Sequence, residues 1–174
     1  GAVCVLLNSW WVPDEVTYGL ENSESMVLIA DEKRLRGLEK FTTLKKIVVR
    51  SNNHSDDYED FNSFISSQSD EFKQQSLDTN DHATIFYTSG STGFPKGVLS
   101  SHRNILATLF SWALVTTLKR EVDNADANQA KDSQTASEPQ NQSAILHCVP
   151  LFHVTGSHSG FLMSILAGRE MVMM

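Results

Sequence analysis

The sequence ATIFYTSGSTGFPKG, residues 83–97, joins an apolar run to a polar, glycine-rich loop. Ala83 to Ser89 has the short apolar pattern of a buried strand. The eleven residues from Tyr87 to Gly97 contain three glycines, four serine or threonine hydroxyls and one lysine. Glycines let backbone N–H groups approach a ligand closely, while hydroxyls and a lysine bind anionic oxygens. The stretch therefore predicts a strand followed by a loop that binds an oxygen-rich anion, most obviously a phosphate.

The spacing of the loop residues differs from two common phosphate-binding loops. A Walker loop has the form G-x-x-x-x-G-K-[ST] and runs directly into a helix. Here Lys96 follows a proline and precedes a strand-like segment, GVLSS. A dinucleotide-binding turn needs G-x-G-x-x-G, and Gly90, Gly93 and Gly97 do not have that spacing. Taken alone, the glycines fit a mobile surface loop equally well.

Apolar runs alternate with helical patterns on both sides of the loop. Pro13 followed by two acids favours a helix start, because proline tolerates the first turn and carboxylates suit its exposed N–H groups. This alternation predicts an α/β fold with a mostly parallel sheet. The other expected strands are Ala2–Leu7, Met26–Ala30, Lys45–Arg50, Ala144–Pro150 and a last one after Gly168. The other expected helices are a short charged one from Asp31, one from His102 to Arg120 and one over residues 156–168. Ser101 is expected to be the N-cap of the helix from His102.

Two polar segments interrupt this pattern. The stretch from Ser51 to His82 has eight acidic residues and one basic residue, so residues 51–81 are expected to be a solvated, loop-rich segment. Residues 121–143 almost lack large apolar side chains and cannot bury enough surface to offset the entropy lost on ordering. We expect a flexible polar insertion there.

Composition excludes several classes of protein. A net charge of −7 and a pI near 5.3 argue against nonspecific nucleic-acid binding, which favours a basic face. The sequence predicts no transmembrane segment, because its apolar runs are too short. Cys4 and Cys148 lie in apolar runs and lack metal-ligand spacing, so they are expected to be buried core residues. Unpaired thiols favour a reducing compartment, either the cytoplasm or an organelle such as the peroxisome.

Two motifs together carry a family resemblance. YTSGSTGFPKG, residues 87–97, resembles position for position the phosphate loop of the adenylate-forming (AMP-binding) superfamily, and VLSSHRN after it resembles the segment that follows. PLFHVTG, residues 150–156, is similar to the second core motif of that family. The opening, residues 1–31, resembles the early part of the same domain. The resemblance covers nearly the whole chain except the acidic stretch and the polar insertion.

The resemblance implies a fold and a reaction. The fold would be part of a layered αβαβα-type N-terminal domain, with residues 1–174 as an incomplete adenylation domain of an acyl-CoA synthetase or aryl-CoA ligase. Such an enzyme activates a small-molecule carboxylic acid with ATP, releases pyrophosphate and then transfers the acyl group to coenzyme A. Mg²⁺ would accompany the ATP. The carboxylate, ATP and coenzyme A are thus the expected partners.

The family motif also implies roles for individual residues. The loop would bind the β- and γ-phosphates through Ser91 and Thr92, with Thr92 also contacting Mg²⁺, and Lys96 would either steady the triphosphate or extend into solvent. His153 would lie at the wall of the acyl and adenylate pocket; judged without the motif, it would simply cap a helix or fill space. The remaining expected loop contacts are Thr88, Ser89, Gly90 and Gly93.

Three functional hypotheses remain open. The chain begins in an apolar run and ends in a strand-like one, so we expect a piece of a longer protein that is not competent by itself. The PLFH form favours an acyl- or aryl-CoA synthetase. A carrier-protein-loading or luciferase-like adenylating enzyme is the second hypothesis. The third is an inactive adenylation-like domain that acts as a nucleotide-binding or interaction module.

Overall fold

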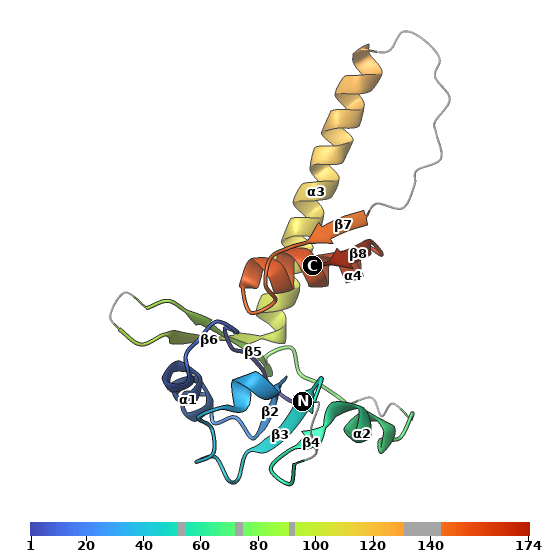
Figure 1. Cartoon of the computed structure of the whole chain (residues 1–174). Coiled ribbons are helices and arrows are strands. Elements are labelled where there is room, and N and C mark those ends of the chain that lie inside the picture. Colours follow the sequence, from blue (N-terminus) through green and yellow to red (C-terminus); the bar gives the residue numbers. More distant parts are fainter. Residues whose placement is uncertain (52–54, 72–74, 91–92, 131–143) are drawn as a thin grey trace. The chain divides into compact units, whose positions relative to one another are not determined.

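The computed structural model describes residues 1–51, 55–71, 75–90, 93–130 and 144–174 (Figure 1). The chain divides into two compact units, Gly1–Leu99 and Ser100–Met174, and we describe each by itself. Within the described ranges, no helix has the length and apolar character needed to cross a membrane. The architecture is mixed α/β with mostly parallel strands, which confirms the predicted fold class.

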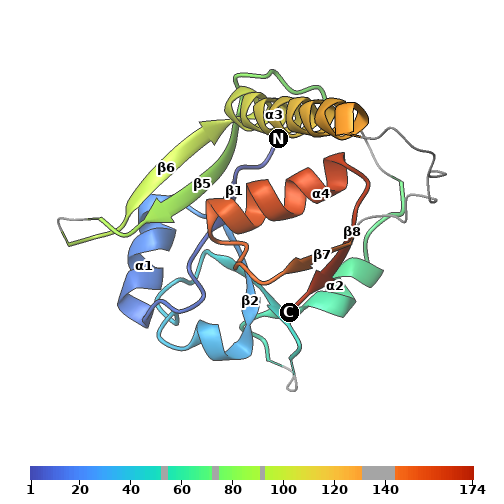
Figure 2. The ribbon, with the colours of Figure 1, turned by 90° about the horizontal axis from the view of Figure 1, so that it is seen from above.

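One sheet of the first unit carries the glycine loop. It has the order β1-β5-β6, formed by β1 (Cys4–Leu6), β5 (His82–Thr88) and β6 (Lys96–Ser101). β1 and β5 are parallel, with Cys4 opposite Thr84 and Leu6 opposite Phe86. Figure 2 shows β5 and β6 running in opposite directions, joined by the loop. The loop therefore begins where the central strand of this sheet ends.

A second parallel sheet of the first unit has the order β2-β3-β4. Its central strand, β3 (Lys45–Val49), buries Ile47 and Val48 almost completely, as expected for a short apolar run between two neighbours. The flanking strands are β2 (Val27–Asp31) and β4 (Glu59–Asp60). Both pair with β3 in parallel.

Helix α1 (Pro13–Asn22) connects β1 to β2. Its N-terminus is stabilised as the sequence predicts: Pro13 occupies the first turn, and the Glu15 carboxylate accepts a hydrogen bond from the Val12 backbone N–H at 3.0 Å. Leu20 of this helix packs with two buried leucines of the loop that leads into β3, in the core of the unit. The members of this core are Leu20, Leu38 and Leu44, with Leu7, Val16, Leu28 and Phe41 packed against them.

The acidic segment contains two short regular elements. Residues 51–81 are expected to be loop-rich, and within them β4 is followed directly by α2 (Phe61–Ser66). The Asp60 carboxylate caps this helix by accepting hydrogen bonds from the backbone N–H groups of Asn62 and Ser63, both at 3.0 Å. A charged stretch can thus form a helix where one of its acids serves as N-cap. A second short element, the 3₁₀ helix η1 (Glu32–Leu35), replaces the expected charged helix after β2.

The second unit is a helix followed by a β-helix-β arrangement. Helix α3 (His102–Ala130) begins directly after Ser101. Strands β7 (Ala144–His147) and β8 (Glu170–Met173) are parallel, and between them lie the π-helix η2 (Thr155–Leu162) and the short helix α4 (Met163–Leu166). A helical crossover is the connection that two parallel strands require.

Two further expectations differ from the structure. The sequence predicts that the long helix ends at Arg120, yet α3 continues to Ala130. Residues 121–130 contain no glycine or proline and include several alanines, so extending an existing helix through them costs little free energy. Residues 131–143 lie outside the described residues. Cys4 and Cys148 are unpaired but exposed, so the prediction that both are buried is wrong. Each lies in an apolar run at a position that faces outward.

Candidate functional site

The glycine loop follows the C-terminal end of β5 and returns into β6. Thr88 is the last residue of β5, and its hydroxyl lies 3.4 Å from the Lys96 carbonyl oxygen, to which it donates. This weak hydrogen bond joins the two ends of the loop. Because ligands of α/β sheets bind beyond the carboxyl ends of the strands, the loop occupies the edge where a binding site is expected.

Two glycines shape the loop for different reasons. At Gly90 a Cβ would lie 2.5 Å from the Phe94 carbonyl oxygen, so the two limbs of the loop pass too closely for any side chain. Gly93 has a φ of +111°, a conformation that strongly favours glycine, and no atom lies within 4 Å of the Cβ position. The predicted contacts Ser91 and Thr92 lie outside the described residues.

Lys96 and Ser89 are exposed at the base of the loop. Among the described residues no carboxylate forms an ion pair with Lys96. The ion pairs in the described part of the chain join Arg34 to Asp31, Lys40 to Glu21, Lys45 to Glu59 and Arg120 to Glu121. The positive charge of Lys96 is therefore available to an anionic ligand. The structure thus brings together Thr88, Ser89, Gly90, Gly93 and Lys96, the predicted loop residues that it describes.

Tyr87 lies in β5 just before the loop and was not among the predicted site residues. Its hydroxyl is 2.8 Å from Asn22 Oδ1 and 3.2 Å from the Gly19 carbonyl oxygen, two acceptors near the end of α1. Burial raises the pKa of the Tyr87 phenol, so the group stays protonated and donates at neutral pH. The available sequence signal was a large polar aromatic residue at the end of a buried strand, next to the motif.

His153 belongs to the second unit and lies just before η2. Its backbone N–H donates to the Pro150 carbonyl at 3.0 Å, and its carbonyl accepts from the Ser157 backbone N–H at 3.0 Å. These bonds form the turn that begins the helix, while the His153 side chain is exposed. These backbone bonds do not depend on the histidine side chain, whose imidazole is exposed.

Two other histidines are buried in the second unit. His147 is 5% exposed, and among the described residues its Nε2 has no hydrogen-bond partner. His158 is also 5% exposed, and its Nδ1 lies 2.9 Å from Ser157 Oγ. Burial lowers the pKa of His158. The sequence assigned neither histidine to a site, and close packing surrounds His147: at Gly160 a Cβ would lie 2.6 Å from His147 Nδ1.

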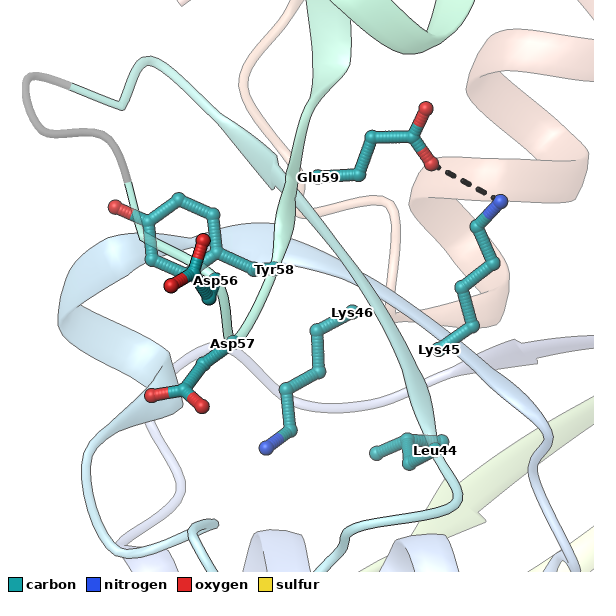
Figure 3. Close-up of a pocket in the computed structure, with 7 residues that line it drawn as sticks. All are labelled: Leu44, Lys45, Lys46, Asp56, Asp57, Tyr58 and Glu59. Carbon is teal, nitrogen blue, oxygen red and sulfur yellow. Dashed lines mark ion pairs between the residues drawn. The ribbon is translucent and has the colours of Figure 1, made fainter.

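A separate hollow of about 390 Å³ lies beside β3 in the first unit (Figure 3). Its charged groups largely compensate one another. Lys45 Nζ lies 3.0 Å from a Glu59 carboxylate oxygen and 4.7 Å from the centre of the Phe64 ring, and the Tyr58 hydroxyl is 2.9 Å from Ser51 Oγ. The lining residues are Leu44, Lys45, Lys46, Asp56, Asp57, Tyr58 and Glu59. None of them belongs to either sequence motif.

No dedicated metal centre is found in the part of the chain that the structure describes. Within it, no group of three or more histidines, cysteines or acids is arranged to hold a metal ion. A magnesium ion usually keeps several waters and is bound through one or two carboxylates together with substrate phosphates. Of the groups in the loop, only hydroxyl and carbonyl oxygens could ligate such an ion, whereas the backbone N–H groups and the lysine ammonium can donate only to phosphate oxygens.

The sequence matches one protein family and many curated proteins. A sequence model described as AMP-binding enzyme matches residues 1–174. The mitochondrial malonate–CoA ligase of Xenopus laevis is 29% identical over the whole chain, which spans 26% of its length. A medium-chain-fatty-acid–CoA ligase of Ectopseudomonas oleovorans is 28% identical over 88% of the chain and 27% of its own length. 4-Coumarate–CoA ligase 2 of Solanum tuberosum is 26% identical over the whole chain and 29% of its own length.

Solved structures show the same fold. The anthranilate CoA ligase AuaEII, in complex with anthranoyl-AMP, has a TM-score of 0.75 at 21% identity and covers 99% of this chain and 30% of that protein. The O-succinylbenzoate CoA synthetase of Bacillus subtilis, in complex with AMP, has a TM-score of 0.64 at 24% identity and covers 97% of this chain and 35% of that protein. The chain thus spans roughly a quarter to a third of the proteins that it matches.

Proposed function

Because this chain belongs to the family of AMP-binding enzymes, we propose that it carries the phosphate-binding loop of an ATP-dependent acid–thiol ligase. In the first step a carboxylate attacks the α-phosphate of ATP, which forms an acyl-adenylate and releases pyrophosphate. In the second step the thiol of coenzyme A attacks the acyl carbon and AMP leaves. The curated relatives, which are CoA ligases by name, support this reaction class.

The observation that carries the proposal is the geometry of the loop base. A lysine without an ion-pair partner among the described residues and a glycine with open space around it lie at the carboxyl end of a buried strand. Charge that develops on the departing pyrophosphate is best stabilised by donors that are already in place. Lys96 supplies a positive charge, and the backbone N–H groups of Gly90 and Gly93 supply neutral donors.

The remaining loop assignments are proposals from the motif. Thr88 and Ser89 would donate their hydroxyls to phosphate oxygens. Ser91 and Thr92, outside the described residues, would contact the phosphates, and Thr92 would contribute to binding of Mg²⁺. The metal ion would neutralise phosphate charge when it is bound with ATP.

The acid substrate is proposed only by class. The relatives named above act, by their names, on malonate, on medium-chain fatty acids and on 4-coumarate, so the shared feature is a carboxylate. His153 is proposed to contact the acyl group or the adenylate, since its imidazole is exposed and it occupies the second motif. The chain spans about a quarter of these relatives, so we propose that residues 1–174 alone do not complete the reaction.

ATP–pyrophosphate exchange tests the proposal. The assay is run with a panel of carboxylic acids on this chain and on the longest protein that contains it, and ATP binding is measured separately. We expect exchange by the longer protein and none by the chain alone. ATP binding without exchange by either, with every acid tried, would favour the nucleotide-binding module instead.

A charge-matched pair of variants locates the site. Lys96→Ala should weaken ATP binding roughly ten- to hundredfold, the range for the loss of a charged hydrogen-bond partner. Lys33→Ala removes an exposed lysine of η1 and should leave binding unchanged. Equal effects of the two substitutions would contradict a specific phosphate contact by Lys96.

A further inference from the structure

Four aromatic rings connect helix α1 to the glycine loop. The Phe94 ring in the loop stacks on the Tyr18 ring of α1, with centroids 4.9 Å apart and an interplanar angle of 28°. Tyr18 also meets Tyr87 of β5 edge-on, with centroids 6.5 Å apart, and Tyr87 meets Trp11 edge-on at 5.4 Å. These are the offset-stacked and edge-to-face arrangements that aromatic pairs prefer.

The inner part of this ring series is fixed to the sheet. The Tyr87 hydroxyl is bonded to acceptors of α1, and at Gly97 a Cβ would lie 3.3 Å from Tyr87 Cε1. At Gly19, which faces the same region, a Cβ would lie 2.9 Å from Trp11 Cζ3. The Tyr87 hydroxyl therefore links β5 to helix α1 by hydrogen bonds, and the Tyr18 ring contacts both Tyr87 and Phe94.

The outer pair of rings, Tyr18 and Phe94, holds the part of the loop that leads into β6, residues 93–96, which we call the limb. The Phe94 side chain is 67% exposed, so burial alone does not hold it. Its ring contact with Tyr18 is the described interaction that ties this side chain to a helix. On either side of Phe94 lie Gly93, whose φ is +111°, and the buried Pro95, which precedes Lys96.

We propose that Tyr18 is a positioning residue for the glycine loop. By stacking on Phe94 it fixes the limb that presents the Gly93 amide and the Lys96 ammonium, so less conformational freedom is lost when an anion binds. This inference rests on the proposed function, since the anion is the triphosphate of ATP. Tyr18 contacts no substrate in this scheme and acts through Phe94.

Limited proteolysis tests the contact without any ligand. Trypsin can cleave after Lys96, in the limb, and after Arg36, an exposed site elsewhere in the same unit that serves as internal reference. Loss of an aromatic pair should raise the population of molecules in which the limb, residues 93–96, is detached and cleavable by roughly three- to tenfold. Tyr18→Leu and Phe94→Leu should therefore each speed cleavage after Lys96 by that factor, relative to cleavage after Arg36. Tyr18→Phe keeps the ring and should cleave like the wild type.

ATP binding by the same variants tests the positioning role. In the longest protein that contains the chain, Tyr18→Leu should weaken ATP binding roughly three- to tenfold, and Tyr18→Phe should restore it. The double variant Tyr18→Leu, Phe94→Leu should bind ATP no more weakly than Tyr18→Leu alone, because the Tyr18 substitution already removes the contact with Phe94. Additive losses would overturn the proposal.

The two measurements separate this inference from the proposed function. Faster cleavage after both Lys96 and Arg36 would mean general destabilisation and would overturn the positioning role. Faster cleavage after Lys96 with unchanged ATP affinity would overturn it as well. A wild-type protein that binds no ATP would overturn the proposed function, while the cleavage pattern would still show whether Tyr18 fixes the limb.

Discussion

Gly90 lies where the two limbs of the loop cross, and the Phe94 carbonyl oxygen occupies the space of a side chain there. Gly90→Ala should displace the limb at a cost of about 1–3 kcal/mol, typical of overpacking, and weaken ATP binding accordingly. At Gly97 the nearest atoms are side-chain atoms of Ile85 and Tyr87, at 3.2 and 3.3 Å, so Gly97→Ala should have a smaller effect. Titration calorimetry with ATP would rank the two variants, and the reverse order would contradict the geometry.

His158 makes the stability of the second unit depend on pH. Because burial lowers its pKa below the usual histidine value of about 6.5, the unfolded chain binds a proton more readily than the folded one. The stabilisation is present above pH 6.5 and is lost as the pH falls through 6.5 toward the lower folded pKa. Thermal unfolding measured from pH 8 to pH 5 should show this loss in the wild type and a weaker dependence in His158→Gln.

The chemistry of single residues was easier to predict than their surroundings. Hydroxyls, glycines and a lysine after a strand indicate an anion site whatever the tertiary structure, so Thr88, Ser89 and Lys96 could be predicted as anion contacts from the sequence alone. The contact of Phe94 with Tyr18 joins two segments about 75 positions apart, which no local pattern specifies. The exposure of Cys4 and Cys148 was missed for the same reason, since an apolar run does not tell which neighbours cover it.

Helix α3 begins with a reciprocal cap between Ser101 and Asn104. The Asn104 backbone N–H donates to Ser101 Oγ at 3.3 Å, and Asn104 Oδ1 accepts from the Ser101 backbone N–H at 3.0 Å. This confirms the predicted N-cap. Ser101→Ala should destabilise the protein by about 1 kcal/mol, and Ser101→Asp should retain most of the stability. Urea unfolding checks both, and an equal loss in the two variants would indicate that the side-chain oxygen is not the stabilising group.

The π-helix η2 packs its glycines directly against backbone and ring atoms. At Gly156 a Cβ would lie 2.6 Å from the Val149 carbonyl oxygen and would also clash with the carbonyl of Pro150. Gly156→Ala should therefore cost about 3 kcal/mol, because backbone cannot move aside as a side chain can. Gly168 has open space but a φ of +60°, so Gly168→Ala should cost only about 1–2 kcal/mol. Denaturant unfolding of the two variants should show this order.

Elements with a strong local signal were predicted well. Apolar runs located β1, β2, β3, β5 and β7, and proline with two acids located the start of α1. The end of α3 was missed because residues 121–130 mix poor helix formers, Asp and Asn, with good ones, Ala, Glu and Gln, and extending an existing helix through them costs less than starting a new one. The π-helix form of η2 (Thr155–Leu162) was also missed, since π-helices are rare and no pattern in this sequence marks one.

The whole chain combines a net negative charge with exposed apolar side chains. Its pI is near 5.3, and Trp10, Met26 and Met174 are 75, 81 and 88% exposed. Near the pI the charge repulsion that keeps molecules apart vanishes, so light scattering should reach a maximum between about pH 5 and 6 and fall again at pH 4. A continued rise down to pH 4 would point to acid unfolding as the cause instead.

The parallel pairing of β1 with β5 also sets an order of events during synthesis. Cys4 pairs with Thr84, so about 80 residues must be made before the first strand finds its neighbour. At ribosomal rates this takes roughly 4–16 s. Closing so long a segment costs only slightly more entropy than closing a short one, because the cost grows with the logarithm of length. The strand that bears the glycine loop is therefore also the strand that must be synthesised before β1 can pair with it.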